Sequence, residues 1–146
     1  MALVYFDASA LVKLIVEEDG SDLSGALWDG CDAPVSSRLA YPEVRAAIAA
    51  AQRNRSLEPT DGAAVERTFE DYWASVRPIE LGRSVEQHAG QLAGLHGLRG
   101  ADAVHLASAL ALEDETLIFA VWDRRLHRAG QTIGLRCAPQ DLPGGP

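Results

Sequence analysis

The chain has 146 residues, 47% of them hydrophobic and 23% charged, which is the composition of one globular domain and excludes a disordered segment. No apolar run approaches the roughly 18–20 residues that cross a bilayer, and no basic segment precedes an apolar one at the N-terminus, so we expect a cytoplasmic protein. The net charge of −8 disfavours a nucleic-acid partner, unless several of the acids are gathered around metal ions.

The first predicted element is a strand at residues 3–6, an unbroken apolar run that is typical of a strand buried on both faces. Asp7 ends this run, and Ser9 is placed to cap a helix that stops at Gly20. An acid between a buried strand and a helix lies at the carboxyl edge of a parallel sheet, where α/β folds bind ligands. Helix capping explains Asp7 equally well on this stretch alone.

Strand and helix patterns alternate along the rest of the chain. A short helix begins at Ser21, and the later strands are predicted at residues 34–36, 76–81, 116–122 and 135–137. Longer helices are predicted at residues 37–55, 63–75, 84–96 and 103–113, and another short helix at 124–129. The alternation indicates a parallel α/β sheet of four or five strands with helices on both sides. We expect one domain over residues 1–138, followed by a Pro/Gly-rich tail at 139–146.

Four acids stand out from the solvated ones. Asp7 and Asp123 each end an apolar strand, so both are expected at the same edge of the sheet. Glu43 and Asp102 lie in the first turns of helices among small or apolar neighbours. Four carboxylates in one place would repel each other, and a hard divalent cation such as Mg²⁺ or Mn²⁺ would resolve the repulsion.

Four segments of the chain resemble, in order and at suitable spacing, the PIN-domain ribonucleases, and more narrowly the VapC toxins. They are Asp7-Ala8-Ser9-Ala10-Leu11-Val12-Lys13-Leu14, the helix around Glu43, Gly100 to Ala107, and Trp122-Asp123-Arg124-Arg125-Leu126. The resemblance implies a PIN-like three-layer α/β/α sandwich. It also implies that the catalytic, metal-binding acids are Asp7, Glu43, Asp102 and Asp123, with Ser9 as the hydroxyl residue beside the first.

The same resemblance implies hydrolysis of RNA, often tRNA or ribosomal RNA, with one or two Mg²⁺ or Mn²⁺ ions. It further implies a homodimer blocked by a small VapB-like antitoxin. Where many relatives have Thr or Ser two residues before the fourth acid, this chain has Val121, which removes one outer hydrogen bond. Two other functions stay open: a DNA nuclease or phosphoesterase using the same acids, and a non-catalytic PIN-like module that binds RNA or protein.

The remaining candidate residues are basic or sulfur-containing. RNA phosphate contacts are predicted for Arg38, Arg45, Arg124 and Arg125, with surface ion pairs as an equal alternative. His105, three residues after Asp102, is predicted to be packed or hydrogen-bonded in the core rather than to act as a base. Surface positions are expected for His88, His96 and His127, and Cys31 and Cys137 are expected to be unlinked thiols.

Overall fold

The fold is built on a five-stranded parallel sheet, seen in a computed structural model that describes residues 2–143. The strand order is β3-β2-β1-β4-β5, so the N-terminal strand lies at the centre of the sheet. The strands are β1 (Leu3–Phe6), β2 (Ala33–Ser37), β3 (Arg77–Ile79), β4 (Ile118–Ala120) and β5 (Arg136–Ala138). The predicted parallel sheet is confirmed, and Pro78 lies on an edge strand as expected.

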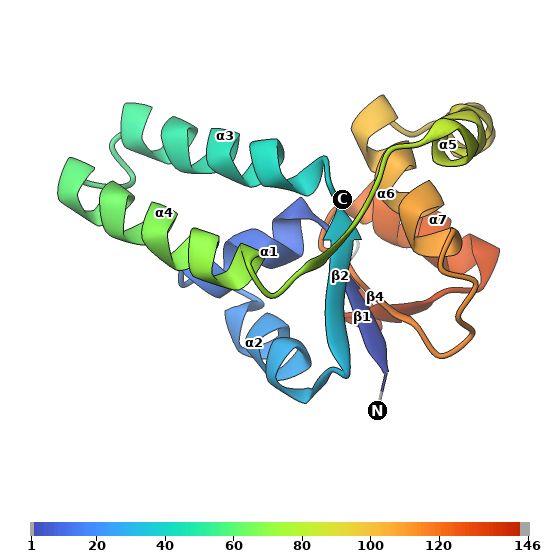
Figure 1. Ribbon diagram of the computed structural model, residues 1–146, viewed down its shortest axis with the longest axis horizontal. Coiled ribbons are helices and arrows are strands. Elements are labelled where there is room, and N and C mark those ends of the chain that lie inside the picture. The colour runs from blue at the N-terminus through green and yellow to red at the C-terminus, as the bar shows by residue number, and fades with distance from the viewer. Residues whose placement is uncertain (1, 144–146) are drawn as a thin grey trace.

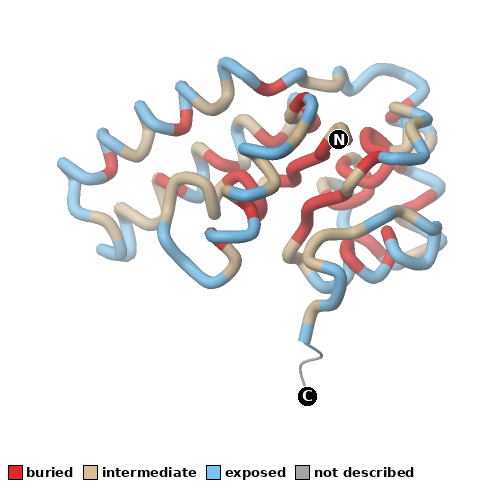
Figure 2. Tube along the Cα trace, turned by 90° about the horizontal axis from the view of Figure 1, so that it is seen from below, coloured by how far each residue is buried: buried red, intermediate tan, exposed pale blue. Residues whose placement is uncertain are grey.

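Helices cover both faces of the sheet and give the predicted three-layer α/β/α sandwich (Figure 1). One face carries α1 (Ala8–Ile15), α2 (Ser21–Gly30), α3 (Ala40–Arg53) and α4 (Pro59–Trp73). The other carries α5 (Arg83–His96), α6 (Gly100–Leu110) and α7 (Arg124–Ile133). Helices α3 and α4 form a hairpin that projects from the sheet, and exposed residues dominate its far end (Figure 2).

The core consists of two apolar clusters, one on each face of the sheet. Val4 and Phe6 of β1 belong to the cluster on the α1–α4 side, whereas Tyr5 belongs to the cluster on the α5–α7 side. This division follows from the alternation of side chains along a strand. The strand between two helical layers therefore needs apolar residues at every position, which is why the run at 3–6 has no polar residue.

Several boundaries near the N-terminus differ from the predicted ones. Asp7, not Ser9, is the N-cap of α1, because its extended backbone lets the side chain accept a hydrogen bond from the Ala10 N–H. Helix α1 ends at Ile15, since Val16 is already extended. Gly20 then starts α2 instead of ending α1, with a left-handed φ of 94° that glycine adopts without strain.

Further corrections concern α4 and α7. Helix α4 begins at Pro59, four residues earlier than predicted, because the fixed φ and missing N–H of proline suit the first turn. Helix α7 continues to Ile133 and is followed by a left-handed Gly134. His127 was expected on the surface, but it is buried, and its Nε2 lies 2.7 Å from the carbonyl oxygen of Pro139. The start of the tail thus packs on α7, while residues 144–146 lie outside the described part of the chain.

Candidate active site

The carboxyl edge of the sheet joins the ends of β1 and β4. The Asp7 N–H donates to the carbonyl oxygen of Ala120 at 3.3 Å, and Ser9 Oγ accepts a hydrogen bond from the Trp122 N–H at 3.1 Å. Asp7 leads into α1 and Asp123 leads into α7, so both acids lie at this edge. Glu43 lies in the first turn of α3 and Asp102 in the first turn of α6.

Asp7 is a buried carboxylate with two hydrogen-bond donors. Its side chain accepts from the Ala10 N–H at 2.9 Å and from Ser9 Oγ at 2.6 Å. Burial, and to a smaller extent the Glu43 charge, raise the pKa of Asp7 to about 6, against the lowering effects of His105 and the two hydrogen bonds. Asp7 therefore caps its helix and is also an acid whose ionised form lacks sufficient compensation.

Asp102 and Asp123 are brought together by a basic residue that sequence reasoning missed. Arg99 Nε donates to Asp102 Oδ2 at 3.1 Å, and Arg99 Nη2 lies 3.6 Å from Asp123 Oδ2. Asp123 also caps α7 by accepting a hydrogen bond from the Leu126 N–H at 2.9 Å. The sequence does hold one sign of this contact. Arg99 lies three residues before Asp102 at the start of a helix, and side chains at this spacing are neighbours.

Glu43 is held by a histidine from the opposite helical layer. His105 Nε2 lies 2.6 Å from Glu43 Oε1, and His105 Nδ1 lies 2.7 Å from the Tyr5 hydroxyl. The structure agrees with the buried, hydrogen-bonded position expected for His105, but its contact with Glu43 was not foreseen. Burial and the Asp7 charge raise the pKa of Tyr5 well above its usual value, so this hydroxyl keeps its proton.

In the structure, the side chains of the four predicted acids are not arranged as one set of metal ligands. Within residues 2–143, no group of three or more His, Cys, Asp or Glu side chains is arranged to hold a metal ion. Asp102 and Asp123 flank the Arg99 guanidinium, and Glu43 faces His105. By residue type, the carboxylate oxygens suit a hard divalent cation. The Arg99 guanidinium between Asp102 and Asp123 shows that this edge accommodates a positive charge.

A hollow of about 520 Å³ lies beside Asp102 and Asp123. Its lining includes Trp122 and three arginines, Arg99, Arg124 and Arg125. The other two arginines predicted to contact RNA form ion pairs with acids: Arg38 with Glu80, and Arg45 with Glu66 and Glu70.

Val121 does not face this hollow. It is fully buried in the core cluster on the α5–α7 side, together with Leu126. At this edge the Ser9 hydroxyl accepts a hydrogen bond from the N–H of Trp122, the residue that follows Val121.

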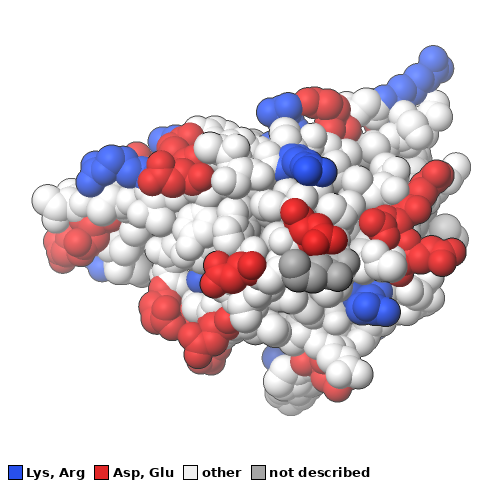
Figure 3. Space-filling model, turned by 60° about the horizontal axis from the view of Figure 1, so that its bottom comes forward, with Lys and Arg blue, Asp and Glu red and all other residues white. Residues whose placement is uncertain are grey.

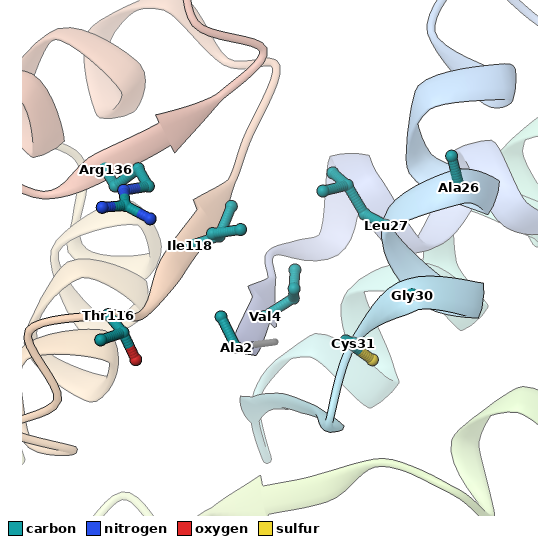
Figure 4. A pocket seen from close by; sticks show the side chains of 9 residues that line it. All are labelled: Ala2, Val4, Ala26, Leu27, Gly30, Cys31, Thr116, Ile118 and Arg136. Carbon is teal, nitrogen blue, oxygen red and sulfur yellow. The ribbon is translucent and has the colours of Figure 1, made fainter.

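A second hollow, of about 420 Å³, lies at the opposite edge of the sheet, where the strands start (Figure 4). Its wall is mostly apolar and has one charged side chain, Arg136, among the residues Ala2, Val4, Ala26, Leu27, Gly30, Cys31, Thr116 and Ile118. None of the four acids lines it. The two hollows are therefore separate, and only the one at the carboxyl edge adjoins the predicted site.

Comparison with known proteins identifies the family. The model of the PIN domain matches residues 4–131. The chain belongs to the PIN-domain family. Ribonuclease VapC49 of Mycobacterium tuberculosis (strain ATCC 25618 / H37Rv) is 64% identical over 142 residues, which cover 97% of this chain and 99% of that protein. This PIN-domain protein is therefore a VapC-type ribonuclease, the toxin class of VapBC toxin–antitoxin pairs.

Solved PIN-domain structures agree in fold. The sarcin–ricin loop cleaving toxin VapC20 of Mycobacterium tuberculosis has a TM-score of 0.67 at 14% identity, covering 97% of this chain and 100% of that chain. VapBC2 from Rickettsia felis, bound to a DNA fragment from their promoter, has a TM-score of 0.62 at 12% identity, covering 94% and 97%. At such identities the likeness concerns the fold alone.

None of the helices within residues 2–143 combines the length and apolarity needed to span a bilayer.

Proposed function

We propose that this PIN-domain protein is a metal-dependent endoribonuclease, the toxin of a type II toxin–antitoxin pair, that hydrolyses phosphodiester bonds in tRNA or ribosomal RNA. One or two Mg²⁺ or Mn²⁺ ions would be held by Asp7, Glu43, Asp102 and Asp123. The observation that carries the proposal is the placement of all four acids at the ends of β1 and β4 and the starts of α3 and α6, at the carboxyl edge of the sheet. High identity to a ribonuclease supports the choice of RNA.

When bound, a divalent cation supplies an activated water and stabilises negative charge on the phosphate. The chain's own residues then orient the carboxylates and bind the RNA. Asp7 is fixed by its two hydrogen-bond donors, so its free lone pairs keep one direction. Ser9 holds Asp7 and the Trp122 backbone at once.

The hollow beside Asp102 has the chemistry of a nucleotide site. Arg124 and Arg125 offer guanidinium groups that match phosphate geometry, and the side chain of Trp122 adds an aromatic group to the lining. Acidic side chains gather in several groups on the face drawn in Figure 3, and basic side chains stand singly among them. Because the chain has a net charge of −8, RNA binding depends on a few arginines at the site rather than on a broad basic face.

Arg99 has two roles in this proposal. Without a metal ion, its guanidinium neutralises Asp102 and Asp123. Its side chain is 74% exposed, so it is free to turn from the carboxylates to an RNA phosphate when a cation takes its place.

We further propose a homodimer, a VapB-like antitoxin as partner, and the cytoplasm as the place of action. The VapBC neighbour supports the antitoxin. Trp28 of α2 is used inside the chain, because its ring packs against Phe6 and Tyr72 at centroid distances of 5.5 and 4.9 Å. The projecting α3–α4 hairpin carries many exposed residues, and these offer a surface for a partner (Figure 2).

The deciding experiment is cleavage of total tRNA and ribosomal RNA by purified protein with Mg²⁺, with Mn²⁺ and with EDTA, beside the Asp7→Asn variant. We expect discrete metal-dependent cuts that the variant does not make. Cutting that persists in EDTA or in the variant would contradict the proposal. Cleavage competed away by single-stranded DNA would favour the DNA-nuclease alternative.

Folded protein that binds RNA without cutting it would favour a PIN-like binding module. The observation in favour of this second candidate is the separation of the acids in the described residues.

A further inference from the structure

We propose that His105 is a positioning residue that orients the Glu43 carboxylate through a directed chain of hydrogen bonds, from Tyr5 to His105 to Glu43. The inference rests on the proposed function, because a fixed Glu43 matters only if this carboxylate holds a cation. It concerns two residues outside the predicted set of ligands, one on the central strand and one on α6.

The Tyr5 end is compatible with this direction, which the Glu43 end then decides. The Ser37 backbone N–H donates to the Tyr5 hydroxyl oxygen at 3.1 Å, so that oxygen is already an acceptor. The hydroxyl has one proton of its own, and His105 Nδ1 lies 2.7 Å away. If Nδ1 accepts this proton, the ring carries its own proton on Nε2.

The other end of the imidazole requires the same direction. His105 Nε2 lies 2.6 Å from Glu43 Oε1, which is hydrogen-bonding distance. An ionised carboxylate offers only acceptors, so a bare Nε2 at this distance would place two lone pairs against each other. Nε2–H facing the carboxylate satisfies both groups.

Burial makes the arrangement rigid. The His105 side chain is 2% exposed, and Tyr5 is fully buried with its ring edge-on to the imidazole at a centroid distance of 5.9 Å. Two packed aromatic rings leave Nε2 one direction in which to point. Helices α6 and α3 lie on opposite faces of the sheet, so the chain of bonds also ties the two helical layers together at the site (Figure 1).

Only one oxygen of Glu43 is used in this way. His105 contacts Oε1, and within residues 2–143 Oε2 makes no hydrogen bond. The geometry therefore leaves Oε2 available to a cation while Oε1 fixes the plane of the carboxylate. A group that hydrogen-bonds to a metal-ligating carboxylate holds that carboxylate in one orientation. The loss of such a partner typically costs about 10–100-fold in metal affinity.

The test is a double-mutant cycle on Mn²⁺ affinity, measured by calorimetry on the full chain with Tyr5→Phe, His105→Ala, His105→Gln and Glu43→Gln. We expect a loss of about 10-fold or more for His105→Ala, a smaller loss for Tyr5→Phe, and partial rescue by His105→Gln, whose amide is a donor near the position of Nε2. In the Glu43→Gln background these changes should have no further effect. His127→Gln, at the other buried histidine, is the matched control and should leave Mn²⁺ affinity unchanged.

A structural role for His105 alone would lower Mn²⁺ affinity equally with and without Glu43, and that result would overturn the proposal. A second readout is the ¹H–¹⁵N spectrum of the imidazole in metal-free protein, assigned by the peaks that His105→Gln removes. A proton on Nδ1 with a bare Nε2 would also overturn it. If Glu43→Gln itself leaves Mn²⁺ binding unchanged, the proposed function loses this ligand, while the spectrum still decides the direction of the bonds.

Discussion

Ser9 Oγ accepts a hydrogen bond from the backbone N–H of Trp122 at 3.1 Å, across 113 positions of the chain. The same hydroxyl donates to Asp7 Oδ1 at 2.6 Å. One side chain thereby joins the ends of β1 and β4 and brings Asp7 to the edge from which Asp123 starts α7.

The first prediction concerns this hydroxyl. Ser9→Ala removes a donor to a buried carboxylate and leaves the Trp122 N–H without its acceptor. We expect the free energy of unfolding to fall by about 1–2 kcal/mol in urea titrations. Ser9→Thr retains a hydroxyl and should be close to wild type. An alanine variant as stable as wild type would show that the bridge contributes nothing.

The second prediction concerns the pH dependence of stability in the metal-free protein. The pKa of Asp7 is raised from 3.8 to about 6 on folding, so its contribution to stability is present below pH 3.8 and is lost as the pH rises through about 6. Asp7→Asn keeps an oxygen to cap α1 and removes the buried charge. We expect the variant to exceed wild type in unfolding free energy by roughly 1–3 kcal/mol at pH 8, with no excess at pH 3.

Urea unfolding at a series of pH values measures this difference. A variant that is less stable than wild type at pH 8 would contradict the prediction. Saturating Mn²⁺ should stabilise wild type more than Asp7→Asn, because the variant has one charged ligand fewer at the proposed site.

The third prediction concerns Arg99, which lies between Asp102 and Asp123. Arg99→Gln removes the positive charge that competes for the two carboxylates, and also a group that would bind phosphate. We expect Mn²⁺ affinity to rise several-fold and RNA affinity to fall, a divergence visible in parallel calorimetric and RNA-binding titrations. If both affinities fall, Arg99 supports the site rather than competing for it.

The fourth prediction concerns the arginines in the hollow at the carboxyl edge. Replacing Arg124 and Arg125 together by Gln should weaken RNA binding and reduce the slope of log affinity against log salt by roughly 1.4, the value for two phosphate contacts on single strands. Arg38→Gln is the control, because Arg38 is paired with Glu80. Unchanged binding and slope in the double variant would remove these residues from the RNA surface.

The local patterns of the sequence were sufficient to predict much of the fold and the acids of the site. The apolar run at 3–6 predicted a strand buried on both faces. The positions of Asp7 and Asp123 directly after apolar runs predicted that both acids lie at the carboxyl edge of the sheet. Such features depend on residues close in the chain: the period of apolar positions, caps, and proline or glycine at turns. The shift of the α4 start to Pro59 and the open choice between Asp7 and Ser9 as the cap of α1 show the limit of these signals, since neighbouring residues compete for one cap.

Other features were decided only by tertiary structure. The guanidinium of Arg99 between two aspartates, the contact of His105 with Glu43 across 62 positions, and the burial of His127 under the start of the tail each depend on elements distant in sequence. Periodicity shows which face of a helix is apolar, but not which polar group from another layer meets it. Because the charge state and direction of a site side chain are determined by that partner, the sequence by itself identified the acids, and only the packed layers determined how they are held.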